Sequence, residues 1–426
     1  MAQEVSPPCP LRLALISGGL KLGGSTTFLC NLAGELVRRR IPVEVLSFEL
    51  HNPLTADFKR LNIPVLCQDD RRAIFEDRLR AVLLELRRFK PTVVVASLAA
   101  SSFEVLRYLP AGVLRVGAVQ SHDPGAYNTV RFYAEQVGLM AAVSRTIEQT
   151  LAAMPEFARV PIGYLPYGVP VPEPPDNPKP DGRLPLRIVY LGRLDQEQKR
   201  VRLFPEILRQ LQASGVPFHW TIAGDGPDGP FLQSVMKSPG PRQTISFPGR
   251  ILYGDVPQLL ADHDVFLLAS DYEGLPLSLL EAMGHGLVPV VSDLPSGIRE
   301  LVHEGTGRRI APDNIAGYAG AIVWLHHHRD EMRCLSQAAR EKVRSEFSVA
   351  AMTERWLSVL QRPAQLDIRW PDRWTFKPIL ASPDKWRFSP PVRVLRRQLL
   401  RLRLQPRLRQ SGSPYPMRRE GQEPRS

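Results

Sequence analysis

Residues 264–293 read DVFLLASDYEGLPLSLLEAMGHGLVPVVSD, and this stretch decides the fold class. Two short apolar runs, at 264–270 and 287–292, flank a helical pattern at about 278–284. Apolar runs that alternate with amphipathic helices indicate a parallel β-sheet that helices cover on both faces. We therefore interpret this segment as one strand–helix–strand unit of an α/β domain.

The same alternation extends over most of the chain, in two blocks. The further predicted strands are 11–16, 43–48, 92–97, 113–119 and 139–144 in the first block, and 186–192, 218–224 and 244–249 in the second. Between the blocks lies VPVPEPPDNPKPDGRLP at 169–185. Proline lacks a backbone N–H, so this stretch cannot join a helix or a central strand, and it is typical of a semi-rigid linker.

The sequence therefore predicts two doubly wound parallel-sheet domains that face each other across a cleft. A chain of 426 residues is long enough for two cores. The predicted organisation is an N-terminal domain at 1–168, the linker at 169–185, a C-terminal domain at 186–345, a helix at 346–362 and a tail at 363–426. Ligands of such sheets bind beyond the carboxyl ends of the strands, which places the site in the cleft.

Composition indicates a cytoplasmic protein. The four cysteines lie far apart, as expected for reduced thiols. The first apolar run has no basic segment before it, so we interpret it as a strand and not as a signal peptide. No run approaches 18 uninterrupted apolar residues, so no transmembrane helix is expected.

The net charge of +12 is concentrated in the tail, where residues 387–426 hold eleven arginines and two glutamates. Residues 392–405 combine basic and apolar side chains, and two interpretations stay open. They can form an amphipathic helix on an anionic lipid surface, a peripheral contact with the inner face of the membrane. Alternatively, they are a tail that packs on the protein or lacks order. Nucleic acid is not an expected partner, because the arginine run has no aromatic residues within it.

Two glutamates, Glu273 and Glu281, are separated by seven residues in the opening stretch. Pro276 fits the first turn of a helix, where a missing N–H costs nothing. The free N–H groups of such a helix start form a natural pyrophosphate site. Glu281, one to two turns on, can accept hydrogen bonds from ribose hydroxyls, and Glu273 can meet a sugar. The backbone groups expected at the ligand belong to Gly274, Leu275, Pro276 and Leu277.

Three other segments follow predicted strands and carry candidate ligand groups. LGRLDQEQKR at 191–200 supplies Arg193 and Lys199, two cations that can neutralise a departing diphosphate. In SGGLKLGGSTTFLCNLAGELVRRR at 17–40, Gly23 and Gly24 let the backbone approach a phosphate or sugar closely. VQSHDPG at 119–125 places His122 at the carboxyl end of a strand.

Together these motifs resemble family 4 of the retaining glycosyltransferases, over roughly residues 11–360. The family has the GT-B fold, in which two Rossmann-like domains face each other. Its E-x7-E signature implies that Glu273 contacts the donor sugar and Glu281 the ribose. Its G-R-L-x-x-x-x-K element corresponds to the segment that holds Arg193 and Lys199. Its glycine pair corresponds to Gly23 and Gly24. Its histidine that contacts the sugar corresponds to His122. The glycine turn FPGRI implies that Arg250 and Ile251 border the base, and Tyr167 stands where the family usually has asparagine.

The resemblance implies a retaining transfer from a nucleotide-diphosphate sugar to an unidentified glycan, lipid or small-molecule acceptor. It implies same-face attack, in which the leaving phosphate takes the acceptor proton, and no metal or other cofactor. Asp262-His263-Asp264 has the form D-x-D, but we interpret it as a helix-to-strand turn. A run of three histidines, His326 to His328, ends a helix. Because successive side chains on a helix point in different directions, the three are not expected to bind one metal ion.

Two alternatives stay open at this point. The same fold can house a phosphorylase or a nucleotide-sugar epimerase. The chain can also be a non-catalytic partner that binds a sugar nucleotide for another enzyme, although its four charged motif residues are all present.

Overall fold

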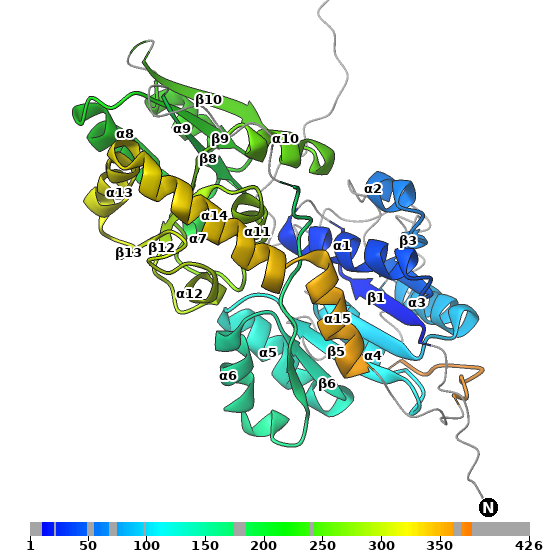
Figure 1. Ribbon diagram of the computed structural model, residues 1–426. Helices are drawn as coiled ribbons and strands as arrows, with labels where there is room; N and C mark the ends of the chain where they lie inside the picture. The colour runs from blue at the N-terminus through cyan, green and yellow to red at the C-terminus, as the bar shows by residue number, and fades with distance from the viewer. Residues whose placement is uncertain are drawn as a thin grey trace, which may run out of the picture.

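The computed structural model describes residues 11–20, 23–48, 55–67, 75–97, 99–173, 185–237, 240, 242–360 and 368–376. Within these ranges the chain forms two α/β domains, each built on its own sheet (Figure 1). All the strand pairs in both sheets are parallel. Most of the linker and the basic stretch at 392–405 lie outside the described residues. None of the described helices combines the length and apolar character that a membrane crossing requires.

The N-terminal sheet has seven strands in the order β3-β2-β1-β4-β5-β6-β7. Its strands are β1 (Leu13–Ser17), β2 (Val43–Ser47), β3 (Val65–Cys67), β4 (Val93–Ser97), β5 (Leu114–Val119), β6 (Leu139–Ala142) and β7 (Ile162–Tyr164). The α-helices are α1 (Gly24–Arg38), α2 (Thr55–Arg60), α3 (Phe75–Phe89), α4 (Ala100–Leu106), α5 (Pro124–Phe132) and α6 (Arg145–Ala152). β1, β2 and β4 are buried along their whole length, as strands covered on both faces must be.

The C-terminal sheet has six strands in the order β10-β9-β8-β11-β12-β13. Its strands are β8 (Leu186–Leu191), β9 (Phe218–Ala223), β10 (Gln243–Gly249), β11 (Val265–Leu268), β12 (Val288–Ser292) and β13 (Arg308–Ile310). The α-helices are α7 (Gln196–Lys199), α8 (Phe204–Ala213), α9 (Gly229–Val235), α10 (Val256–Ala261), α11 (Leu277–Gly284), α12 (Gly297–Leu301), α13 (Ile315–His327), α14 (Arg329–Glu346) and α15 (Val349–Leu360). The strand orders of both sheets reverse direction beside the first strand, which is the doubly wound topology.

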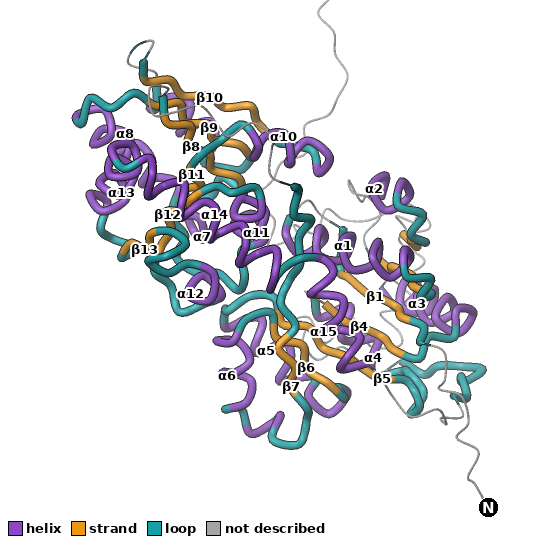
Figure 2. Tube along the Cα trace, viewed as in Figure 1, coloured by secondary structure: helices purple, strands orange, loops and turns teal. Residues whose placement is uncertain are grey.

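The chain crosses between the domains more than once. After β7 it runs from the N-terminal domain toward β8, and α15 later returns to pack against α1 (Figure 2). The two crossings touch, because the Gly168 N–H lies 3.1 Å from the Met352 sulfur and Val169 forms a bridge with Ser348. Farther on, Trp374 donates its indole N–H to the Tyr108 carbonyl over 3.3 Å. Part of residues 363–391, a stretch rich in tryptophan and proline, therefore lies on the N-terminal domain.

Candidate active site

The central contact of the site is an ion pair between two residues singled out from the sequence. Lys199 Nζ lies 2.5 Å from Glu273 Oε1, and the two side chains are 15% and 6% exposed. Ser270 donates its hydroxyl to the same carboxylate oxygen over 2.7 Å. Glu273 stands on the loop between β11 and α11, and Lys199 ends α7, so the carboxyl ends of two neighbouring strands supply the pair.

Local hydrogen bonds hold Lys199 in this position. Asp195 caps α7 by accepting the N–H groups of Gln198 and Lys199 over 2.9 and 3.4 Å. The helix then stops at Arg200, which has a left-handed φ of 48°. The Arg200 guanidinium pairs with Asp271 over 3.2 Å, which ties α7 to the loop that carries Glu273.

Arg193 lies at the same edge of the sheet but does not contact Glu273. Its guanidinium pairs with Asp195 and donates to the Gln198 side chain over 3.0 Å. Gln198 in turn donates to the Tyr272 carbonyl over 3.2 Å. The Arg193 side chain is 55% exposed, so a ligand can still reach its guanidinium.

Glu281 lies on α11 and carries the clearest electrostatic signal of the site. It is half-buried, and no hydrogen bond or ion pair joins its carboxyl group to any residue that the structure describes. Burial raises the pKa of Glu281 to about 8. A carboxyl group without a protein partner can accept hydrogen bonds from the hydroxyl groups of a ligand, which is what the ribose role requires.

The starts of α1 and α11 face each other across the two domains. A Cβ atom added to Gly24 would lie 3.0 Å from the Leu277 Cβ, so a larger residue here would crowd the contact between the two helices. Gly23 precedes α1 with a φ of 153°. Pro276 is the N-cap of α11, which corrects the expectation that it would occupy the first turn. The first N–H groups of both helices lack intrahelical partners, and both helix dipoles are positive at this end.

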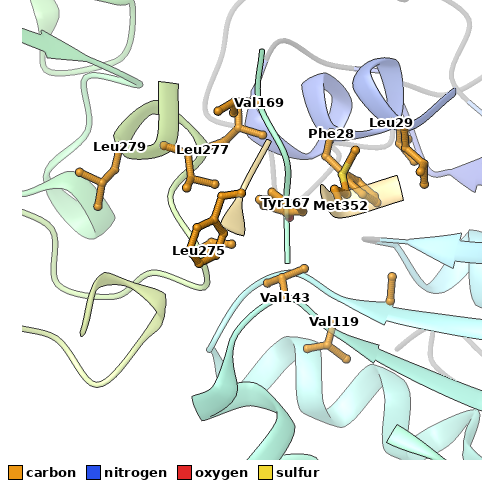
Figure 3. Close-up of a cluster of buried hydrophobic side chains, with 14 of the residues drawn as sticks. Phe28, Leu29, Val119, Val143, Tyr167, Val169, Leu275, Leu277, Leu279 and Met352 are labelled. Carbon is orange, nitrogen blue, oxygen red and sulfur yellow. The ribbon is translucent and has the colours of Figure 1, made fainter. Parts of the chain in front are cut away.

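An apolar seam beside these helix starts joins the two domains. Figure 3 shows Tyr167 between Leu275 and Leu277 on one side and Phe28 on the other. The rings of Tyr167 and Phe28 lie 5.0 Å apart. Burial raises the pKa of Tyr167, a hydrogen bond with Ser25 partly offsets this, and the charge of Glu273 adds to it. The tyrosine that replaces the family's asparagine is therefore a buried interdomain residue.

Gly274 brings the Glu273 loop against the N-terminal domain. A Cβ atom at Gly274 would clash with the carbonyl oxygen of Gln120 and lie 3.3 Å from Ser121 Cα. The Gly274 carbonyl accepts the Gly297 N–H over 2.7 Å, which fixes the loop from its other side. The loop that leads to His122 is thus in direct contact with the loop that leads from Glu273.

His122 is held by its own domain. Its Nδ1 lies 2.6 Å from the Tyr127 hydroxyl, and the two rings meet edge to face. Burial lowers the pKa of His122, and the Asp123 carboxylate partly offsets this. The imidazole is therefore neutral at pH 7, and one ring nitrogen is held by tyrosine.

Arg250 and Ile251 directly follow β10, and Arg250 is exposed. Two residues later, Tyr253 donates its hydroxyl to the Asn31 Oδ1 over 2.7 Å, from one domain to the other. Asn31 also donates to the Gly168 carbonyl over 2.9 Å. Burial raises the pKa of Tyr253, and the nearby Cys30 and Glu281 raise it further. Tyr253 was not predicted, because nothing in its local sequence distinguishes it from a core tyrosine.

The side chains of the D-x-D segment, Asp262 to Asp264, form hydrogen bonds with neighbouring residues of their own domain. Asp264 accepts the Arg187 guanidinium over 2.9 Å, and Asp262 accepts the Gln258 amide over 2.9 Å. His263 is buried, with Nδ1 2.6 Å from the Leu259 carbonyl. Within the described ranges, no three or more His, Cys, Asp and Glu side chains form a group suited to a metal ion.

Comparison with known proteins finds a family match for the C-terminal half of this site. Residues 185–328 match the family described as glycosyl transferases group 1. The chain is 36% identical over 186 residues to WcaL of Salmonella typhimurium, named for a glycosyltransferase of colanic acid biosynthesis, which covers 42% of this chain and 45% of WcaL. It is 32% identical over 187 residues to the amylovoran biosynthesis glycosyltransferase AmsK of Erwinia amylovora, covering 42% and 46%. The chain thus aligns with less than half the length of these relatives.

A solved structure agrees on the fold across both domains. A mutant of S. aureus TarM, in complex with fondaparinux, α-GlcNAc-glycerol and UDP, superposes with a TM-score of 0.69 at 12% identity. The match covers 83% of this chain and all of the other. With two parallel-sheet domains and this similarity, the chain has the GT-B fold, and its residues 185–328 match the glycosyl transferases group 1 family.

Proposed function

We propose that this chain is a retaining glycosyltransferase that moves a sugar from a nucleoside diphosphate to an acceptor hydroxyl. The observation that carries the proposal is the Lys199–Glu273 ion pair beside the start of α11. It combines a cation, a carboxylate and unpaired helix N–H groups at one edge of the sheet. These are the groups needed to hold a pyrophosphate next to a sugar.

In the proposed donor complex, the diphosphate lies beside the adjoining starts of α1 and α11, and Glu281 accepts hydrogen bonds from the ribose. Lys199 and Arg193 face the phosphate oxygens. Arg250 and Ile251 border the base. Glu273 binds sugar hydroxyls, and His122 reaches the sugar from the N-terminal domain. Each assignment rests on the family resemblance and on the position of these residues near the carboxyl ends of the strands.

The reaction breaks the bond between the anomeric carbon and the phosphate oxygen. Negative charge develops on the leaving diphosphate, and Lys199, Arg193 and the helix N–H groups stabilise it. The acceptor oxygen attacks from the same face, and its proton passes to the departing phosphate oxygen. Glu273 positions the sugar, because Lys199 and Ser270 already engage its Oε1, which makes that oxygen a poor nucleophile.

The proposed chemistry uses no divalent metal, since protein cations and N–H groups neutralise the leaving group. Incubation with UDP-glucose, UDP-GlcNAc, GDP-mannose and ADP-glucose, each with a panel of glycan and lipid acceptors, tests the function. Transfer with retained anomeric configuration, unaffected by EDTA, is the expected result. Loss of transfer in EDTA with recovery in Mn²⁺ would contradict the metal-free mechanism. Phosphate-dependent cleavage would indicate a phosphorylase, and binding without turnover a non-catalytic partner.

A further inference from the structure

One polar side chain beside the site has no partner. Gln120, the residue directly after β5, is only 9% exposed. Both its amide nitrogen and its amide oxygen are buried, and neither has a hydrogen-bond partner among the residues that the structure describes. Buried amides nearly always have partners, and each unsatisfied group costs stability. Within the described part of the chain, the unpaired amide of Gln120 therefore lowers the stability of the fold.

The position of Gln120 is part of the domain contact already described. Its own carbonyl oxygen is what a Cβ atom at Gly274 would strike, so it lies next to the loop that carries Glu273. His122 follows two residues later in the same loop. Gly117 on β5 faces α4, because a Cβ atom there would lie 2.8 Å from the Phe103 ring. Side chains alternate along a strand, so the Gln120 register position is on the face opposite to α4.

An amide that is buried without a partner suits a ligand that brings its own hydroxyl groups. The carboxamide offers two donors and one acceptor, which matches the mixed donor and acceptor character of a sugar hydroxyl. A phosphate would supply acceptors only, and a nucleobase is expected at the other end of the site, near Arg250. The sugar is the part of the donor that belongs between Glu273 and His122.

We propose that Gln120 is a specificity-determining residue that hydrogen-bonds a hydroxyl of the transferred sugar. This inference rests on the proposed function and adds a residue to it. A site built to pair with a substrate hydroxyl discriminates strongly against ligands that lack it, because its buried polar groups then stay unpaired. Gln120 thus favours sugar nucleotides over the bare nucleoside diphosphate.

The test replaces Gln120 by methionine, which has a similar shape without the amide. The matched control is Gln243→Met, because the Gln243 amide donates to the Val216 carbonyl over 3.0 Å at the start of β10. Thermal unfolding of the free proteins is compared first. Loss of an unpaired amide should leave the Tm of Gln120→Met unchanged or raise it, whereas Gln243→Met should lower the Tm because a carbonyl loses its donor.

Titration calorimetry with UDP and with UDP-glucose, UDP-GlcNAc and UDP-galactose then measures the sugar contribution. Gln120→Met should keep the wild-type affinity for UDP and weaken the preferred sugar nucleotide by roughly tenfold, the usual effect of one lost hydrogen bond in a buried site. Gln243→Met should bind both ligands like the wild type.

The outcomes separate the inference from the function beneath it. A lower Tm or failure to fold in Gln120→Met, or an unchanged affinity for the sugar nucleotide, overturns the role of Gln120 alone. Equal weakening of UDP and UDP-sugar binding also overturns it, because the amide would then act on the nucleotide. If the wild-type chain binds no nucleotide in this panel or in the GDP and ADP series, the proposed function fails and the inference fails with it.

Discussion

Tyr164 of the N-terminal domain donates its hydroxyl to Glu300 of the C-terminal domain over 2.7 Å. The other Glu300 oxygen accepts the Arg145 N–H, at the start of α6, over 2.5 Å. Burial raises the pKa of Glu300, and these two hydrogen bonds partly offset it. Glu300 lies on α12, whose first residue, Gly297, donates to the Gly274 carbonyl. One short helix therefore connects the donor loop to the opposite domain.

Replacing Glu300 by alanine should weaken the contact between the two domains. Loss of hydrogen bonds to a charged group typically costs about 1.5–3 kcal/mol, so we expect kcat/KM to fall by roughly tenfold or more. Small-angle X-ray scattering should show a larger radius of gyration. Glu148→Ala is the control, because Glu148 pairs with Arg145 within α6 alone. Identical scattering and kinetics for Glu300→Ala and the wild type would exclude this coupling.

Lys199→Met and Arg193→Ala should both slow sugar transfer, because each removes a cation that faces the leaving diphosphate. Loss of one stabilising group of this kind typically costs about 10²–10³ in kcat. Lys199→Met should also lower the Tm, since it leaves the buried Glu273 carboxylate unpaired. Arg193 is exposed, so its loss should hardly change the Tm.

Single-turnover rates with a radiolabelled sugar nucleotide measure both effects. Lys342→Met provides the control, because Lys342 makes a comparable pair with Glu346 over 3.0 Å on α14, in a surface position. If both variants transferred the sugar at the wild-type rate, Lys199 and Arg193 would not stabilise the leaving diphosphate.

Donor affinity should rise as the pH rises from 7 to 9. Burial raises the pKa of Glu281 from 4.5 to about 8, so most of the group is protonated at pH 7. Ribose hydroxyls donate best to the ionised carboxylate, and at pH 7 only about one tenth of the molecules are ionised. We therefore expect the Kd of UDP to fall by roughly tenfold over this range, whereas Glu281→Gln should bind with little pH dependence.

The same pKa shift sets the direction of a stability effect. Because the folded-state pKa of Glu281 lies above its ordinary value of 4.5, its contribution is fully present below pH 4.5 and is lost as the pH rises toward 8. The stability of the wild type relative to Glu281→Gln should therefore decline between these values, in urea unfolding experiments at each pH. A constant difference in stability between the wild type and Glu281→Gln across this pH range would argue against a raised pKa of Glu281.

Gly274→Ala should push the domains apart, because the new Cβ atom would meet the Gln120 carbonyl. Backbone atoms on both sides cannot yield cheaply, so we expect a lower Tm and at least about tenfold weaker transfer. Gly320→Ala on α13 is the matched control, since a Cβ atom there meets nothing within 4 Å. Alanine in place of an exposed helical glycine should be neutral or stabilising. Equal behaviour of the two variants would show that the Gly274 contact tolerates a side chain.

Most of the fold could be predicted from the sequence, because it depends on local patterns. Buried parallel strands are continuous apolar runs, and the structure confirms a strand at each of the predicted positions. The strands that were missed, β3, β7 and β13, have three residues each, too few to form a pattern, and β13 contains two arginines. α14 was also missed, because its strongly polar sequence buries only one narrow stripe of side chains.

The sequence by itself determined which residues stand at the carboxyl ends of strands, since Lys199, Glu273 and Glu281 each follow a strand at motif spacing. Only the tertiary structure decided which of them meet. It joined Lys199 to Glu273 across 74 positions of the chain and left Glu281 without a partner among the described residues. It also set Gly274 against Gln120, and Glu300 against Tyr164. Such contacts depend on how two domains pack, and no periodicity within either domain records that arrangement.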